Sequence, residues 1–114
     1  MLKNLLIDEY PLLVPPTLAS EIGLNEAIAL QQIHFWISKS KNFKDGKYWV
    51  YNTYDDWQKQ FPFWSVSTIR RVFKSLEEKK LIETANYNEM KYDQTKWYTI
   101  NYDKLNKIVS DCSK

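Results

Sequence analysis

The chain has 114 residues, the length of a single domain, and 16% of them are aromatic. Disordered chains lack aromatic side chains and carry a large net charge, so a disordered protein is excluded. A membrane-spanning helix needs a run of about 18 apolar residues, which the sequence does not contain. A single Cys and a single His exclude a disulfide framework and a Cys/His zinc site.

The formal net charge of +2 conceals an uneven distribution of charge along the chain. Residues 1–34 carry one Lys and four acidic residues, for a net charge of −3. Residues 35–82 carry ten Lys and Arg and five acidic residues, for +5, and residues 83–114 are neutral. The middle of the chain is therefore the candidate basic surface, with an ordinary solvated surface as the simpler alternative.

The ends of the chain indicate its compartment. The apolar run at residues 2–7 is short and is followed at once by Asp8 and Glu9, which is unlike a signal peptide. The one cysteine, Cys112, lies in a polar tail. We therefore expect a cytoplasmic protein with no membrane partner.

The first half of the chain predicts two helical segments and a strand. Residues 12–14 are apolar and are followed by two prolines, which predicts an extended segment or an edge strand. A helical turn is expected at residues 17–22, stopped by Gly23. Residues 24–40 are apolar around most of a helical circumference, which predicts a central buried helix. Residues 48–51 have high β propensity and predict a short strand.

Two amphipathic helices are expected next. The first begins with Thr53 as its N-cap and is ended by Pro62. The second begins with Ser65 as its N-cap and extends to about residue 79. The connection between them is mostly aromatic, so we expect it to be packed. The predicted buried stripe of the second helix consists of Val66, Ile69, Val72, Phe73 and Leu76.

The last third of the chain predicts a β-hairpin and a closing helix. Residues 81–84 and 97–102 are the candidate strands, separated by a long polar tip. Tyr98 and Tyr102 lie on the same face of the second strand if it keeps a period of two. Residues 103–109 are expected to form a short C-terminal helix.

This order of elements predicts an α+β fold, namely a winged helix-turn-helix over residues 1–114 with a small three-helix core, a β-hairpin wing and a short C-terminal helix. In this fold the second helix of the helix-turn-helix enters the major groove of DNA with its N-terminal residues at the base edges. Small hydroxyl residues there permit close approach, arginines bind guanine or phosphate, and lysines bind phosphates. The candidate DNA-binding residues are Ser65, Ser67, Thr68, Arg70, Arg71, Lys74, Lys91 and Lys96.

Several stretches resemble a known family over about residues 5–105. Residues 24–36 look like the first long helix of replication initiators from phages and plasmids of Gram-positive bacteria. Later stretches are similar to the N-terminal winged-helix domain of DnaD-like replisome organisers. The resemblance implies binding of origin DNA, self-association as a dimer or higher oligomer, and contact with replication proteins such as a helicase loader. The similar later stretches are residues 49–52, 57–65, 67–71 and 96–98.

Two features depart from that family. Many winged helices place a glycine after the recognition helix, where this chain has Lys80. If left-handed geometry is needed there, lysine costs about 1 kcal/mol relative to glycine. Such initiators also continue into a C-terminal domain. We therefore expect either the N-terminal part of a longer initiator or a stand-alone winged helix, such as a transcriptional repressor.

Catalytic chemistry is not expected. His34 lies in the predicted central helix, where a packing role is commoner than a catalytic one. The acidic pairs at residues 55–56 and 77–78 point apart, since neighbouring helical residues face different directions. Gly23 and Gly46 are the only glycines, so there is no phosphate-binding glycine loop. We expect no enzyme, no cofactor and no metal site.

The aromatic residues raise the main alternative to DNA binding. Those at the turn between the two amphipathic helices and under the wing are expected to pack and to fix the angle between helix and wing. Around Trp49 and Tyr51 an interface with a protein is favoured, and stacking on single-stranded bases is the other option. A winged helix that binds only proteins therefore remains an alternative.

Overall fold

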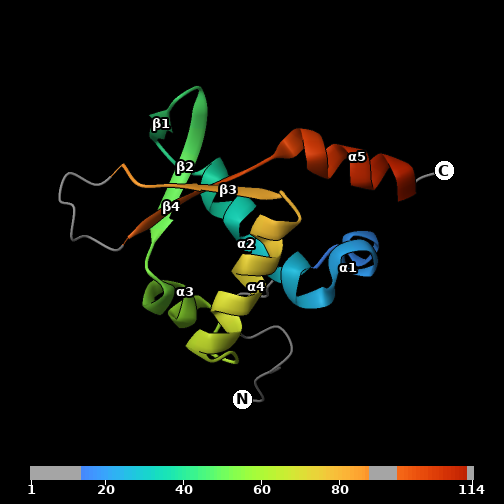
Figure 1. Ribbon diagram of the computed structural model, residues 1–114, viewed down its shortest axis with the longest axis horizontal. Coiled ribbons are helices and arrows are strands. Elements are labelled where there is room, and N and C mark those ends of the chain that lie inside the picture. Colours follow the sequence, from blue (N-terminus) through green and yellow to red (C-terminus); the bar gives the residue numbers. More distant parts are fainter. Residues whose placement is uncertain (1–13, 88–94, 113–114) are drawn as a thin grey trace, which may run out of the picture.

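The computed structural model describes residues 14–87 and 95–112. Within these residues it contains five helices and a four-stranded antiparallel sheet, so the predicted α+β class is confirmed (Figure 1). In chain order the elements are α1 (Pro16–Ile22), α2 (Leu24–Ser38), β1 (Asn42–Lys44), β2 (Lys47–Asn52), α3 (Tyr54–Gln60), α4 (Val66–Glu78), β3 (Ile82–Ala85), β4 (Lys96–Ile100) and α5 (Tyr102–Cys112).

The sheet brings together strands that are far apart in the sequence. Its strand order is β1-β2-β4-β3, and every neighbouring pair is antiparallel. Val50 of β2 pairs with Tyr98 of β4, while Ile82 of β3 pairs with Ile100 of β4. The three predicted strands and the hairpin of β3 and β4 are therefore confirmed. Residues 88–94 of the expected hairpin tip lie outside the described part of the chain.

Strand β1 is the element that the sequence does not predict. Its residues Asn42 and Lys44 have low β propensity, so the segment lacks the usual signature of a strand. The strand forms because a two-residue turn folds it back onto β2. The turn residues Asp45 and Gly46 have φ angles of 52° and 77°, the left-handed values that tight hairpin turns require.

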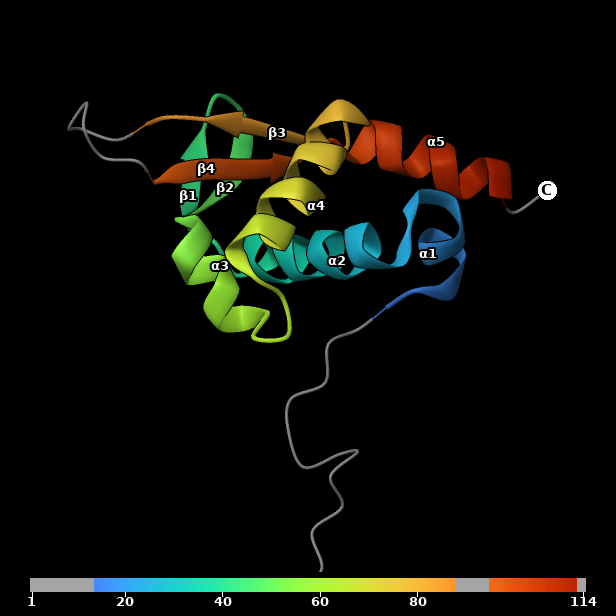
Figure 2. The same cartoon turned by 60° about the horizontal axis from the view of Figure 1, so that its bottom comes forward.

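A row of aromatic rings runs through the core from the α3–α4 connection to the sheet. Helices α2, α3 and α4 lie on one side of the sheet (Figure 2). Ring centroids lie 6.2 Å apart between Phe63 and Phe61 and between Phe61 and Trp57. The row continues at 5.3 Å from Trp57 to Phe73 and at 5.3 Å from Phe73 to Tyr98. The expected packing is confirmed for Trp57, Phe61 and Tyr98, which are buried, whereas Phe63 at the turn is 58% exposed.

The start of α3 is determined by side chains that the sequence identifies. The Thr53 hydroxyl accepts a hydrogen bond from the Asp56 amide at 3.1 Å, and the Asp56 carboxylate accepts one from the Thr53 amide at 3.1 Å. This reciprocal pair is a capping box, which satisfies two amides at the helix start. The predicted cap at Thr53 is confirmed.

The end of α4 has the geometry that glycine usually provides. The amide of Lys80 donates to the carbonyl of Glu77 at 2.9 Å, and the amide of Leu81 donates to that of Leu76 at 3.0 Å. These two bonds form a Schellman motif, whose residue after the cap adopts a left-handed conformation. Lys80 has that conformation, with φ of 60°. The helix thus ends in the expected left-handed turn, although lysine adopts this conformation less favourably than glycine.

Two expectations about the helices are wrong. Helix α2 is not buried all round: Phe35 and Trp36 are 40% and 39% exposed, because neighbouring elements cover only one side of this end of the helix. Tyr102 does not continue β4 but begins α5, because the Asn101 side chain accepts a hydrogen bond from the Lys104 amide at 3.1 Å and starts a helix. The predicted extended run at residues 12–14 lies outside the described residues except for Val14.

Candidate nucleic-acid interface

One face of α4 is exposed and basic. Ser67, Arg70, Arg71 and Lys74 are exposed and follow one another at helical spacings of three or four residues. The opposite face carries the side chains that are packed in the core, so the helix is held rigidly with this basic face outward. The buried residues of α4 are Ile69, Val72, Phe73 and Leu76. Val66, predicted to be buried with them, is half-buried.

Ser65 and Thr68 cap the helix start. The Ser65 hydroxyl accepts a hydrogen bond from the Thr68 amide at 3.2 Å, and the two hydroxyl groups lie 3.1 Å apart. The predicted N-cap at Ser65 is confirmed. Both hydroxyls are therefore engaged within the helix, whereas Ser67, which lies between them in the sequence, is exposed and its hydroxyl has no hydrogen-bond partner among the described residues.

The connection before α4 fixes the position of the helix. Phe61, the C-cap of α3, is fully buried, and its ring lies 4.9 Å from that of Trp64. The Gln58 side chain donates a hydrogen bond to the Trp64 carbonyl at 3.2 Å. The angle between α3 and α4 is thus set by packed aromatic rings and a side-chain hydrogen bond.

Tyr54 brings Arg70 and Lys96 together, although these three residues belong to three different elements. The guanidinium carbon of Arg70 lies 5.5 Å from the centroid of the Tyr54 ring, and Lys96 Nζ lies 5.2 Å from it. Lys96 also donates a hydrogen bond to the Tyr54 hydroxyl at 3.1 Å. Both distances to the ring lie within the range of cation–π contacts. Tyr54 could not be identified from the sequence, because no local spacing connects α3, α4 and β4.

These residues line a cleft between the start of α3, the start of α4 and the base of the β3–β4 hairpin. The cleft has a volume of about 710 Å³. Its walls include Arg70 and Lys96 as cationic groups and Asp55 as an acidic one. Of the predicted site residues, the structure thus joins Arg70 and Lys96 in one cleft.

The other predicted DNA-binding residues lie apart from this cleft or outside the described part of the chain. Arg71 and Lys74 are exposed on α4, and neither pairs with a carboxylate in the part of the chain that the structure describes. Lys91 falls among residues 88–94, outside the described part.

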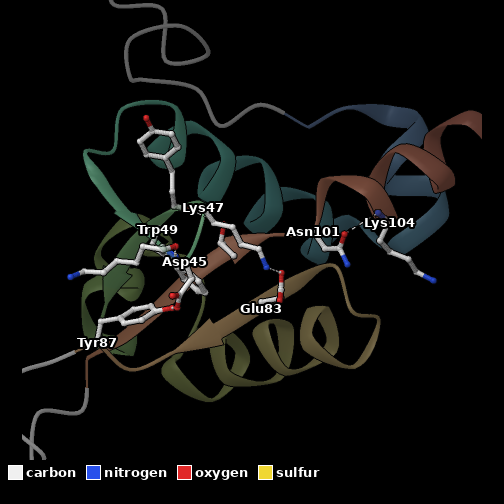
Figure 3. A network of polar contacts seen from close by, with 10 residues as sticks. Asp45, Lys47, Trp49, Glu83, Tyr87, Asn101 and Lys104 are labelled. Atoms are coloured by element: carbon white, nitrogen blue, oxygen red, sulfur yellow. Dashed lines mark hydrogen bonds and ion pairs between the residues drawn. The ribbon is translucent and has the colours of Figure 1, made fainter.

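The outer face of the sheet, opposite the helices, carries an aromatic cluster of Trp49, Tyr51, Tyr87 and Trp97. The Tyr87 ring lies 5.3 Å from the rings of both Trp49 and Trp97. Its hydroxyl donates a hydrogen bond to the carboxylate of Asp45, which raises the pKa of Tyr87 (Figure 3). Trp49 is only 4% exposed, so of the pair predicted to form a protein interface only Tyr51, 51% exposed, is available for contact.

Two polar contacts tie the hairpin of β1 and β2 to β3 and β4, and Figure 3 shows the one between Lys47 and Glu83. Lys47 and Glu83 form an ion pair at 2.7 Å, with both side chains nearly half exposed. The Thr99 hydroxyl donates a hydrogen bond to the Tyr48 carbonyl at 2.7 Å. Exposed ion pairs stabilise weakly, so the buried Thr99 contact is the stronger constraint.

His34 is exposed and not part of the core, contrary to its placement in a buried helix. Its Nδ1 lies 2.8 Å from the Tyr102 hydroxyl, and the two rings meet edge to face at 5.8 Å. The histidine therefore joins α2 to the start of α5. Within residues 14–87 and 95–112, no group of three or more His, Cys, Asp and Glu is placed to hold a metal ion.

None of the helices formed by the described residues has both the length and the apolar character needed to cross a membrane. Comparison with protein-family models, with curated proteins and with solved structures gives no match to this chain.

Proposed function

We propose that this chain is a winged helix-turn-helix domain that binds double-stranded DNA without catalysis. The order of elements supports the fold, since α2, the hairpin of β1 and β2, α3, α4, β3 and β4 occur in this order along the chain. In this proposal α3 and α4 are the helix-turn-helix, α4 is the recognition helix, and the β3–β4 hairpin is the wing.

The exposed face of α4 is the observation that carries this proposal. Arg70, Arg71 and Lys74 share it, and none of them is paired with a carboxylate in the described part of the chain. Three neighbouring cations repel one another, and a polyanion relieves this repulsion when its phosphates replace bound counterions. Ser67, small and exposed at the helix start, leaves room for a base edge.

Recognition of DNA by this face divides between phosphates and bases. Arg71, which has no partner within the described residues, is assigned to a base edge, where arginine binds guanine through two hydrogen bonds. Lys74 lies one turn from Arg70 and suits a phosphate. The capped start of α4, a helix of 13 residues, directs further amides toward the same groove.

We further propose that the bound DNA is a replication origin of a phage or a plasmid. The resemblance of residues 24–36 and of the later stretches to replication initiators supports this assignment. A transcriptional repressor would use the same surface on a different DNA site. Selection of bound fragments from a phage or plasmid genome separates the two, because an initiator enriches the origin and a repressor enriches a promoter.

The test of DNA binding is a titration of labelled duplex by fluorescence anisotropy at several salt concentrations. The logarithm of the binding constant should fall linearly with the logarithm of the salt concentration, with a slope of about −0.9 for each phosphate that is neutralised. A binding constant that does not respond to salt would contradict the proposal.

The exposed aromatic side chains favour a protein-binding surface as the second candidate function. Trp36, Tyr51 and Phe63 are 39%, 51% and 58% exposed, and aromatic residues are enriched at protein interfaces. Sedimentation of the chain distinguishes the candidates. A stable dimer that buries Arg70 and Arg71 would support the second candidate, whereas a species that leaves both arginines free for DNA would support the first.

A further inference from the structure

Arg70 and Arg71 are neighbours in the sequence but lie in different environments. The guanidinium group of Arg70 lies over the Tyr54 ring, toward β4, while Arg71 has no partner in the described part of the chain. A guanidinium carbon 5.5 Å from the ring centroid is within the range of a cation–π contact, and the N–H groups of such a guanidinium stay available to a ligand. Arg70 is therefore held in place, whereas Arg71 is free to reach into a groove.

Lys96 is held by the same tyrosine. Its ammonium group donates one hydrogen bond to the Tyr54 hydroxyl at 3.1 Å, which leaves further N–H donors for a ligand. The two cations are thus anchored on one ring, one from the proposed recognition helix and one from the base of the proposed wing.

Tyr54 is itself fixed by the core. It is the first residue of α3, directly after the capped Thr53, and its ring meets the buried Phe73 ring edge to face at 6.4 Å. Its side chain is half-buried. A ring held in this way restricts the positions of Arg70 and Lys96, so less conformational entropy is lost when an anion binds between them.

We propose that the cleft between α3, α4 and β4 is a binding site for a phosphate of the DNA backbone, with Arg70 and Lys96 as its two cationic contacts and Tyr54 as the residue that positions them. The assignment of this phosphate to DNA rests on the proposed function. It gives the adjacent arginines separate tasks: Arg70 binds the backbone, and Arg71 reads base edges. Asp55 lines the same cleft and weakens binding of an anion by repulsion.

The main experiment measures duplex binding by Tyr54→Phe, Lys96→Ala and the double variant. Tyr54→Phe keeps the ring under Arg70 and removes the oxygen that accepts from Lys96, so affinity should fall by about two- to tenfold, as expected for one hydrogen bond. On the Lys96→Ala background the same substitution should have no further effect. A merely structural role of Tyr54 predicts the same loss on both backgrounds, and that result would overturn the assignment.

The salt dependence separates the two arginines. Arg70→Ala and Lys96→Ala should each reduce the magnitude of the log–log salt slope by about 0.9 and weaken binding equally for all sequences. Arg71→Ala should instead reduce the difference in affinity between the preferred duplex and a scrambled one. If Arg70→Ala changes sequence preference and leaves the slope unchanged, Arg70 is not a phosphate contact.

A second measurement does not depend on DNA. Inorganic phosphate is titrated into the chain while the side-chain N–H resonances of Arg70 and Lys96 are followed by NMR. Both should shift together, Tyr54→Phe should abolish the shift at Lys96 and retain the one at Arg70, and Asp55→Asn should lower the phosphate concentration required. If neither resonance shifts on addition of phosphate, the proposed phosphate site is wrong. Phosphate binding without duplex binding would refute the proposed function alone, and duplex binding unaffected by Tyr54→Phe would refute the positioning role alone.

Discussion

The indole N–H of Trp57 and the hydroxyl of Tyr98 are both buried in the core, with their rings 5.8 Å apart, and neither forms a hydrogen bond of good geometry with any of the described residues. Buried polar groups are nearly always hydrogen-bonded, since an unpaired one loses its contacts with water without compensation. The aromatic row thus contains two polar atoms that reduce the stability of the fold.

Removal of the buried hydroxyl by Tyr98→Phe should therefore raise the free energy of unfolding by about 1 kcal/mol at neutral pH. Denaturant titration measures the change. Tyr51→Phe is the matched control, because its hydroxyl is exposed and its removal should change stability by less than about 0.5 kcal/mol. A loss of stability in Tyr98→Phe would show that the hydroxyl has a partner after all.

The same hydroxyl makes stability depend on alkaline pH. Burial raises the pKa of Tyr98 above its ordinary value of 10.0, so above that pH the unfolded chain loses this proton while the folded chain keeps it. The contribution of Tyr98 to stability does not change with pH below pH 10, and above it the free energy of unfolding should fall by up to about 1.4 kcal/mol for each pH unit. Unfolding curves between pH 9 and 11 should be flatter for Tyr98→Phe, and equal slopes in both chains would contradict the argument.

At the end of α4, Lys80→Gly should stabilise the protein by about 1 kcal/mol, because glycine adopts the left-handed φ of 60° without the steric cost that lysine has. Lys79→Gly is the matched control, since Lys79 has an ordinary φ of −78° and the same charge is lost. That control should lose about 0.5 to 1 kcal/mol. Thermal unfolding of both variants tests whether their changes in stability have opposite signs.

The capping box of α3 should make helix stability depend on acidic pH. The backbone amide of Thr53 and then its hydroxyl hold the pKa of Asp56 below its ordinary value of 3.8. The contribution of Asp56 is therefore present above that value and is lost as the pH falls through the lower pKa of the folded state. Thr53→Ala should cost about 1 kcal/mol at pH 7.

The loss of stability on removal of the Asp56 side chain, compared between neutral and acidic pH, distinguishes capping from packing. Asp56→Ala should be destabilising at pH 7 and less so at pH 2, where more of the Asp56 carboxyl group of the parent chain is protonated in the folded and in the unfolded state. Asp55→Ala removes a neighbouring charge without a capping bond and serves as the control. If Asp56→Ala is equally destabilising at both pH values, the ionised carboxylate does not contribute.

For DNA binding, Arg71→Ala should weaken binding to the preferred duplex by about 1–3 kcal/mol, the range for a bidentate contact with a base. Lys107→Ala in α5 removes an exposed charge of the same sign outside the proposed interface, and it should leave affinity nearly unchanged. Fluorescence anisotropy at one salt concentration compares the two. Similar losses in both variants would mean that only overall charge matters.

The features that depend on neighbouring residues could be predicted from the sequence. The caps at Thr53 and Ser65 were predictable, because a hydroxyl side chain satisfies amides only two or three residues away. The left-handed conformation of Lys80 could also be expected, because this residue stands where many winged helices have a glycine after the recognition helix. The basic face of α4 follows from helical spacing once the helix is assigned.

The features that the sequence did not reveal depend on contacts between distant segments. The surroundings of α2 could not be read from its apolar residues, because exposure of Phe35 and Trp36 depends on where the neighbouring elements end. The position of Tyr54 between Arg70 and Lys96 requires three elements to be in place. Strand β1 forms because the turn at Asp45 allows pairing, although Asn42–Lys44 has little preference for β structure.

The aromatic row from Phe63 to Tyr98 has a consequence for how the molecule opens. Each ring is in contact with the next, so α3, α4 and β4 cannot separate without the loss of several contacts at once. Their amide hydrogens should therefore exchange with solvent in one cooperative event that approaches global unfolding. The helix and the strand proposed to hold DNA would then keep a fixed spacing in every state short of the unfolded chain.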